Sequence, residues 1–179
     1  MIDVTIRPAS SVDTPAVAAF CQPIYAAVYP NDKYGLKPEH FSAEIFQTPD
    51  TLAYFSSILT NSDTQRAYIA EQGGSIVGTI SIERLDGFYE IHAFYVAVEL
   101  QGQGIGRRLM SGALTFCADR LPVLVEVAET SASAISLYKH WGFRPAPQLG
   151  IHLRHWPEWP EGLKNGYIFL QANQGDIHV

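Results

Sequence analysis

Apolar residues in the first third of the chain recur every three or four positions and are interrupted by prolines. A short alternating run at residues 4–7 predicts a first strand. The helical spacing then predicts three segments, at residues 14–22, 39–46 and 49–59. Two of them start at a threonine–proline pair, Thr14-Pro15 and Thr48-Pro49, which suits an N-cap and the first helical position. We expect Pro23 to kink or break the first helix, because proline has no backbone N–H to donate.

From Gln65 onwards the period changes to two, which is typical of strands. The alternating segments predict three strands, at residues 66–71, 76–85 and 88–98. Glycine-containing turns join them as an antiparallel meander. Farther along, the pattern predicts a helix at residues 105–117, a buried strand at 123–128 and a second helix at 132–141. It then predicts a strand that starts at residue 143 and a last strand at 167–170. The buried strand should run parallel to the third strand of the meander, because a helical crossover joins them.

Three glycines at alternate positions separate the meander from the helix that follows it. The turn reads Gln101-Gly102-Gln103-Gly104-Ile105-Gly106-Arg107. Missing Cβ atoms let the backbone close on a ligand, the first amides of a helix have no intrahelical partner, and the helix dipole favours negative charge. The sequence therefore predicts a phosphate-binding turn.

A Rossmann dinucleotide site is the rival interpretation of this turn. Its G-x-G-x-x-G fingerprint would place glycine at position 107, where the chain has Arg107, although Glu126 lies at a suitable distance for a ribose contact. A Rossmann unit also begins from a parallel sheet, whereas an antiparallel meander leads in here. We therefore expect the turn to belong to a fold other than the Rossmann fold.

Composition narrows the class of protein. The chain has 179 residues and no obvious linker, so we expect one domain over residues 1–179 with a core at about 4–171. A net charge of −6 argues against a general nucleic-acid or anionic-membrane binder. The start does not resemble a signal peptide, and no apolar run reaches the ~18–20 residues of a membrane span. With two cysteines and no Cys/His cluster at zinc spacing, we expect no disulfide framework, no metal and a cytoplasmic location.

Three features together resemble the GNAT superfamily of acyl-CoA N-acyltransferases. The first is the turn Gln101–Gly106, of the form Q/R-x-x-G-x-G/A, after a strand that ends Phe94-Tyr95-Val96. The second is the segment Ala134–Phe143, similar to the family's A-x-x-x-Y-x-x-x-G-F, and the third is the order of elements over roughly Val4–Leu170. The resemblance implies an α/β fold of the GNAT type, with a mixed, mostly antiparallel, splayed sheet and helices on both faces.

The resemblance also implies acetyl-CoA as the acyl donor. In the family, the end of the central strand binds the pantetheine arm and the glycine turn binds the pyrophosphate. These roles fall on Val96, Ala97 and Val98, and on Gln101, Gly102, Gln103, Gly104, Ile105, Gly106 and Arg107. Carbonyl binding near Val96 requires the strand to splay, and we expect a bulge near Ala97. Ser131 stands where the family often has an asparagine that contacts the arm, and it either makes that contact or caps the helix. Arg107 either reaches a phosphate or forms part of a solvated helix face.

Transfer to an amine needs a base that removes its proton. By the resemblance, the base is Glu90, eleven residues before Gln101, as in the histone-acetylating branch of the family. Alternation places Glu90 on one strand face with His92, Phe94 and Val96, where apolar neighbours would raise its pKa. Three other interpretations remain open: a solvated Glu90 paired with a cation such as Arg84, His92 as the base, and a chain of water molecules without any single base.

The acid that protonates the leaving thiolate is expected at Tyr138, where the family has a tyrosine near the CoA sulfur. The other interpretation is a core aromatic residue on an amphipathic helix. Aromatic and histidine residues are candidates for the acceptor side, through cation–π contact with an amine, at Tyr25, Tyr29, Tyr34, His152, His155, Trp156 and Trp159. Alternatively, the two tryptophans hold the segment 145–165, which is expected to be irregular, against the body of the protein.

The predicted function is transfer of an acetyl group from acetyl-CoA to a primary amine of a small molecule or peptide by direct attack, with no metal and no covalent enzyme intermediate. No nucleic-acid or membrane partner is expected, and a homodimer is left open. Two alternatives come from other classes. One is a catalytically silent acyl-CoA-binding sensor of the same fold, and the other is a structural dimer module.

Overall fold

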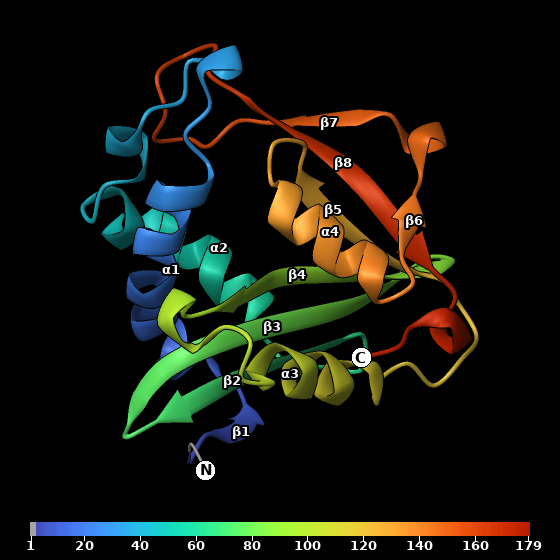
Figure 1. Cartoon of the computed structure of the whole chain (residues 1–179). Helices are drawn as coiled ribbons and strands as arrows, with labels where there is room; N and C mark the ends of the chain where they lie inside the picture. The colour runs from blue at the N-terminus through green and yellow to red at the C-terminus, as the bar shows by residue number, and fades with distance from the viewer. Residues whose placement is uncertain (1–2) are drawn as a thin grey trace.

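The computed structural model describes residues 3–179, which form one eight-stranded mixed sheet with helices on both faces (Figure 1). The strands are β1 Thr5–Pro8, β2 Gln65–Gln72, β3 Ser75–Leu85, β4 Phe88–Val96, β5 Val123–Ala128, β6 Arg144–Pro145, β7 Ile151–Arg154 and β8 Asn165–Ala172. The helices are α1 Thr14–Val28, α2 Pro49–Ile58, α3 Ile105–Leu114 and α4 Ala132–His140, with short 3-10 helices between them. The strand order is β1-β2-β3-β4-β5-β8-β6, and β7 also pairs with β8. The predicted fold class is confirmed.

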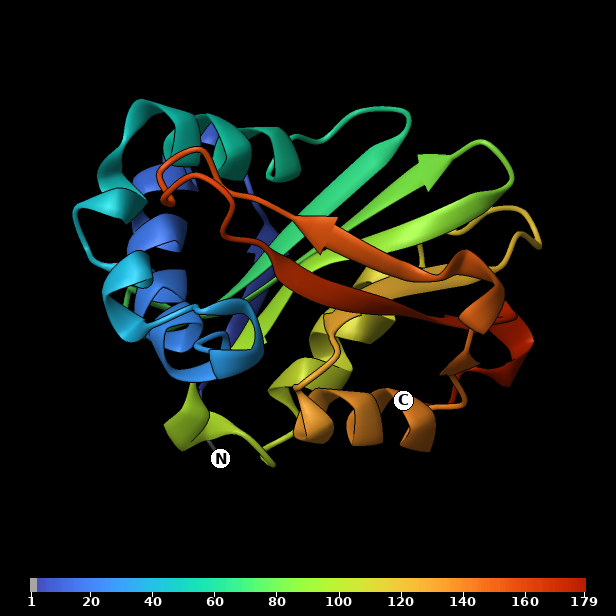
Figure 2. The same cartoon turned by 90° about the horizontal axis from the view of Figure 1, so that it is seen from above.

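The helices pack on the sheet in two separate layers (Figures 1 and 2). Helices α3 and α4 cover one face, where Leu109 and Tyr138 join a core cluster with Ile80 of β3. Helices α1 and α2 cover the opposite face, where Val17 and Phe55 belong to a second core cluster. No helix within residues 3–179 is both long and apolar enough to cross a membrane.

The strand pairing confirms the predicted topology. Strands β2, β3 and β4 form the antiparallel meander, and β5 lies parallel to β4 after the α3 crossover. Strand β8 then returns antiparallel to β5 and pairs with the whole length of β5.

Three local predictions differ from the structure. Helix α1 continues past Pro23, because the carbonyl of Ala19, which loses its helical donor, belongs to an exposed residue that water can reach. The predicted helix at 39–46 is instead two short 3-10 helices, Pro38–Phe41 and Ile45–Gln47. The segment expected to be irregular contains strand β7, which is hydrogen-bonded along β8.

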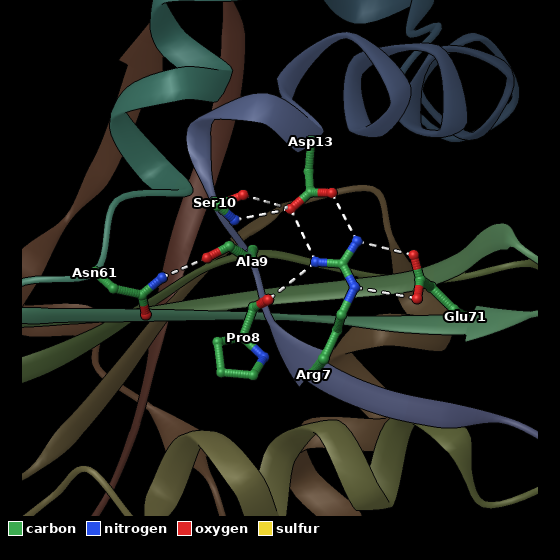
Figure 3. Close-up of polar contacts among 7 residues, drawn as sticks. All are labelled: Arg7, Pro8, Ala9, Ser10, Asp13, Asn61 and Glu71. Carbon is green, nitrogen blue, oxygen red and sulfur yellow. Dashed lines mark hydrogen bonds and ion pairs between the residues drawn. The ribbon is translucent and has the colours of Figure 1, made fainter.

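An ion-pair network fastens β1 to the start of α1 and to β2 (Figure 3). The Arg7 guanidinium donates to both carboxylate oxygens of Asp13, at 3.0 and 2.7 Å, and to both oxygens of Glu71, at 3.1 and 2.8 Å. Asp13 also accepts a hydrogen bond from the Ser10 amide at 2.8 Å. Asn61 completes the junction by donating to the Ala9 carbonyl at 2.6 Å. This network sets the direction in which α1 leaves the sheet.

Candidate active site

Strands β4 and β5 are neighbours in the sheet but separate halfway along. They pair only where residues 89–91 of β4 face residues 123–125 of β5. Beyond Ile91, β4 pairs only with β3, while β5 continues along β8 as far as Ala128. The splay expected from the sequence is therefore present. It leaves one edge of each strand free to line a cleft.

A β-bulge lies in the middle of β4, at the start of this splay. Thr79 of β3 pairs with Tyr95, whereas Ser81 pairs with His92, so two β4 residues stand opposite a single β3 residue. Within residues 3–179, Ala93 is the only residue other than glycine with a positive φ, at 46°. The bulge expected near Ala97 is therefore located about four residues earlier.

The bulge decides which β4 side chains lie together. Phe94 and Val96 pack into the core under α3, where a Cβ on Gly106 would meet them at 3.3 and 3.6 Å. Glu90 and His92 precede the extra residue and lie on the opposite face of the sheet, within 4.0 Å of each other. The predicted common face of Glu90, His92, Phe94 and Val96 is therefore wrong, because one inserted residue reverses the alternation.

A cleft of about 710 Å³ fills the opening between the splayed strands. The glycine turn and the beginning of α3 line one end, and α4 with the free edge of β4 lines the centre. Residues of α1, α2, β5, β7 and β8 line the other end. The cleft thus connects the predicted phosphate turn to an interior lined by tyrosines, one glutamate and one arginine.

The glycine turn presents unpaired backbone amides to the cleft. Gly102 and Gly104 have φ values of 76° and 83°, and a Cβ on either would meet no atom within 4 Å. The first hydrogen bond of α3 runs from the Arg108 amide to the Gly104 carbonyl at 3.0 Å, and within residues 3–179 none of the amides of 102–107 donates one. Open space, free N–H groups and the helix dipole fit the pyrophosphate of CoA.

Not every predicted CoA residue reaches the cleft. The residues that line it are Val96, Gln101, Gly102, Gly104, Gly106, Arg107 and Ser131, whereas Ala97, Val98, Gln103 and Ile105 do not. The Ala97 amide is already bonded to the Val77 carbonyl at 2.9 Å. Ser131 sits at the N-cap of α4 but its side chain does not cap the helix. It is 9% exposed and its Oγ has no hydrogen-bond partner within residues 3–179, which fits a hydrogen bond to a ligand in the cleft.

Tyr138 lines the cleft from α4 and is 5% exposed. Its ring packs on Phe143, with centroids 5.5 Å apart, and faces Phe94 at 6.3 Å. Burial raises the pKa of the Tyr138 phenol above its ordinary value, so the hydroxyl stays protonated at neutral pH. The residue therefore packs as a core aromatic and also lines the cleft, with its phenol protonated.

Glu126 is a buried carboxylate of the cleft that was not among the predicted site residues. Its side chain is 7% exposed and lies within the apolar strand β5. One oxygen forms an ion pair with Arg154 Nη2 at 2.5 Å, and the other contacts His152 Nδ1 at 2.6 Å. The signal in the sequence was a single acidic residue in the apolar run Val123–Ala128, since a buried carboxylate is costly unless it is paired.

Glu90 lies outside the cleft. It lines a second hollow of about 530 Å³, which shares only Arg154 with the cleft and does not include Tyr138. The structure therefore does not bring the two predicted catalytic residues into one cavity. Burial, together with the charge of Glu126, raises the pKa of Glu90, in the direction expected from the sequence. The suggested partner Arg84 instead pairs with Asp119 at 2.8 Å.

His92 lines the cleft, and its side chain is 17% exposed. Burial lowers the pKa of His92 to about 4, so the imidazole is neutral at pH 7. Its Nε2 has no hydrogen-bond partner. A neutral imidazole at this place can accept a proton only weakly.

Aromatic side chains line the end of the cleft beyond Glu126. Of the candidates for the acceptor side, Tyr25, Tyr29 and Trp156 line it, whereas Tyr34, His152, His155 and Trp159 do not. Tyr54 and Tyr167, which were not predicted, line it as well. The Trp159 indole donates to the His40 carbonyl at 3.0 Å, so this tryptophan holds the loop against the body.

Comparison with known proteins agrees with this geometry. The sequence model of the Acetyltransferase (GNAT) family matches residues 30–143, and the chain belongs to this family. The N-alpha-acetyltransferase RimI of Mycobacterium tuberculosis is 35% identical over 91 residues, which cover 49% of this chain and 55% of that protein. The chain thus spans about half the length of this relative.

Solved structures share the fold at low sequence identity. A GNAT acetyltransferase from Staphylococcus aureus Mu50 has a TM-score of 0.65 at 16% identity, over 94% of this chain and 99% of that one. The PaiA N-acetyltransferase of Thermoplasma acidophilum, in complex with coenzyme A, has a TM-score of 0.62 at 15% identity, over 95% and 99% of the two chains. These likenesses establish the fold.

Proposed function

We propose that this protein transfers an acetyl group from acetyl-CoA to a primary amine, which enters at the Glu126 end of the cleft. The proposal depends on one observation, the continuity of a single cleft from the free amides of the glycine turn to Tyr138 and Glu126. Membership of the GNAT acetyltransferase family supports the same class of reaction.

When bound, acetyl-CoA supplies the acetyl group as a thioester. The amides of residues 102–107 would hold its pyrophosphate, because they are unpaired and lie at the positive end of α3. Arg107, which is exposed and lines the cleft, would add a positive charge there. The unpaired hydroxyl of Ser131 and the free edge of β4 would hold the arm.

Glu126 is the residue best placed to remove a proton from the acceptor. An amine must lose a proton to react, and Glu126 is a carboxylate that lines the cleft. Its partner His152 has a side chain that is 50% exposed, so a proton taken up by Glu126 has a route to solvent. Arg154 holds the carboxylate in place from the other side.

Tyr138 is the residue best placed to donate a proton to the departing thiolate. Its phenol is protonated at neutral pH, and its hydroxyl makes no hydrogen bond within residues 3–179, so its proton is not committed to another acceptor. General acid or base assistance of this kind is typically worth ~10²–10⁴-fold in rate. Attack by the amine on the thioester carbonyl is direct, and no residue of the chain need form a covalent bond.

The acceptor that we propose is an unhindered primary amine such as the α-amino group of a peptide. The support is the name of the similar protein from Mycobacterium tuberculosis, an N-alpha-acetyltransferase. The tyrosines and the tryptophan at the acceptor end would pack against an ammonium or an apolar side chain.

The experiment is a thiol-release assay with acetyl-CoA and a panel of polyamines, aminoglycosides, amino acids and N-terminal peptides. With the best acceptor, Glu126→Gln and Tyr138→Phe should each lower kcat by ~10²–10⁴-fold while the Kd for CoA stays within about twofold. Glu39→Gln, an exposed residue on the 3-10 helix Pro38–Phe41, is the control and should have no effect. If the unaltered protein bound CoA but none of the amines in the panel led to thiol release, the protein would instead be an acyl-CoA sensor.

A further inference from the structure

The second hollow lies on the sheet directly beside the proposed reaction site. Its lining includes Glu90 of β4, Leu124 of β5 and Phe169 of β8, together with His152 and Arg154 of β7. These strands are neighbours in the sheet (Figure 1). The lining residues therefore place the hollow across four strands. The two cavities meet at the ion-paired side chains of Glu126, His152 and Arg154: Glu126 lines the cleft, His152 lines the hollow and Arg154 lines both.

Glu90 is a nearly buried carboxylate without a partner in the free protein. Its side chain is 13% exposed, and within residues 3–179 it accepts no hydrogen bond. In the described part of the chain, the only basic group within 4.0 Å of Glu90 is His92, at 3.9 Å. Burial lowers the pKa of that histidine to about 4, so it carries no charge at pH 7. The charges of Arg154 and His152 offset part of the rise in the pKa of Glu90, but within residues 3–179 neither side chain forms an ion pair with it, and the Arg154 guanidinium is engaged by Glu126 at 2.5 Å.

A second carboxylate increases the cost of this arrangement. Glu83 of β3 stands directly opposite Glu90 in the antiparallel register, and among the described residues its only basic neighbour within 4.0 Å is also the neutral His92. Like charges directly opposite on paired strands destabilise a sheet. A cation placed in the hollow would offset both the repulsion and the burial of Glu90.

The distance between Glu90 and Glu126 indicates how far the hollow lies from the proposed position of the reacting amine. Glu90 is level with Leu124 in the parallel pairing, and Glu126 lies two residues further along β5. From the usual strand spacing and rise, the Cα atoms of Glu90 and Glu126 are roughly 8 Å apart. The apolar side chains of Phe88, Leu124 and Phe169 line the hollow beside Glu90. They suit an alkyl linker.

We propose that the second hollow binds a second positive charge of the acceptor, with Glu90 as a specificity-determining residue. The acceptor is then a dication, in which an alkyl chain separates the reacting amine from another ammonium or guanidinium group. A linear diamine and a peptide with a basic side chain next to its N-terminus share this chemistry. The inference rests on the proposed function, because Glu126 marks the end at which the reacting amine is bound.

The test compares matched acceptors that differ in the second charge. The small pair is 1,5-diaminopentane and hexylamine, and the peptide pair is Ala-Lys-amide and Ala-norleucine-amide. In one of the two pairs, the unaltered protein should show a kcat/KM for the dication at least about tenfold above that for the analogue without the second charge. That pair identifies whether the acceptor is a diamine or a peptide. Glu90→Gln should reduce the ratio to near unity, mainly through KM.

Two further variants make the result specific. Glu83→Gln should lower the ratio less, because Glu83 has a side chain that is 36% exposed and does not line the hollow. Glu39→Gln changes an exposed residue that is far from Glu90 in the sequence, and it should leave the ratio unchanged. A Glu90→Gln protein that loses kcat equally for both members of a pair would overturn the proposal, because Glu90 would then act as the base.

A binding measurement keeps the inference testable if no amine is acetylated. Calorimetric titration of 1,5-diaminopentane and of Ala-Lys-amide into the free protein should give, for one of them, a Kd that rises about tenfold or more in Glu90→Gln. Equal affinity of the two proteins for both probes would overturn the subsite whatever the assay of turnover shows. Absence of thiol release with retained, Glu90-dependent binding would remove the proposed function and leave the cation site.

Discussion

Gly104→Ala tests whether the backbone conformation of the turn creates the phosphate site. Gly104 precedes α3 with a φ of 83°, and a Cβ at this position would meet no atom within 4 Å. Alanine therefore introduces no clash, only the left-handed strain of about 1–2 kcal/mol. The chain can keep the conformation and lose that much stability, or relax the turn and displace the amides that follow it.

Gly74→Ala is a matched control in the hairpin between β2 and β3. Gly74 has a φ of 80°, its Cβ would also meet no atom within 4 Å, and the residue does not line the cleft. Urea unfolding should show that each variant keeps its fold and loses at most about 1–2 kcal/mol of unfolding free energy. In calorimetry, Gly104→Ala should weaken CoA binding by roughly 5- to 30-fold, because binding must restore the strained turn. Gly74→Ala should leave the Kd unchanged.

A truncated ligand identifies the part of CoA that is affected. Pantetheine lacks the pyrophosphate, so its affinity should be the same in Gly104→Ala and in the unaltered protein. If both glycine variants bound CoA equally well, the amide cradle would be refuted. If pantetheine binding fell as much as CoA binding, the substitution would have disturbed the cleft more widely than the turn.

The remaining predictions concern stability. Arg7→Met should lower the free energy of unfolding by about 1–3 kcal/mol, because it leaves the Asp13 side chain, which is 10% exposed, without a cation. Arg84→Met removes an exposed ion pair and should lower it by less than about 1 kcal/mol. Arg7 lowers the pKa of Asp13, so the deficit of Arg7→Met in urea unfolding should be full above the ordinary pKa of 3.8 and shrink as pH falls further. Burial lowers the pKa of His92 from 6.5 to about 4, so between these values the unfolded chain binds a proton that the folded chain does not. Stability should therefore fall as pH drops through this range, and His92→Gln should flatten the fall, while an unchanged slope would contradict the neutral imidazole.

Regular periodicity made most of the fold predictable. The meander and the apolar strand β5 bury alternate or successive side chains, and burial of that kind leaves a pattern in the sequence. The short strand β7 leaves no such pattern, because Ile151 and Leu153 are exposed and His152 is exposed as well. Its pairing to β8 is fixed by tertiary contacts that a local pattern does not record.

The donor half of the candidate site was more predictable than the acceptor half. The glycine turn is continuous in sequence, and its requirement for positive φ at Gly102 and Gly104 restricts residue type. Glu126, Arg154 and Tyr167 meet only because β5, β7 and β8 are assembled, and they come from three separate segments. Whether Glu90 shares a strand face with Phe94 and Val96 depended on a single inserted residue in β4, which the alternation of the sequence does not reveal.

That inserted residue has a measurable consequence of its own. Ala93 holds a φ of 46°, a conformation that costs a non-glycine residue about 1–2 kcal/mol. Ala93→Gly relieves this strain. It also removes a buried methyl group and adds conformational entropy to the unfolded chain, which together cost about 1–2 kcal/mol, so the net change in unfolding free energy should be close to zero. Ala67→Gly in β2 is fully buried and in regular register with Ser81, so it should show the loss alone, about 1–2 kcal/mol in urea unfolding. Equal destabilisation by the two substitutions would mean that Ala93 is not strained, and the reversal of side-chain alternation in β4 would need another cause.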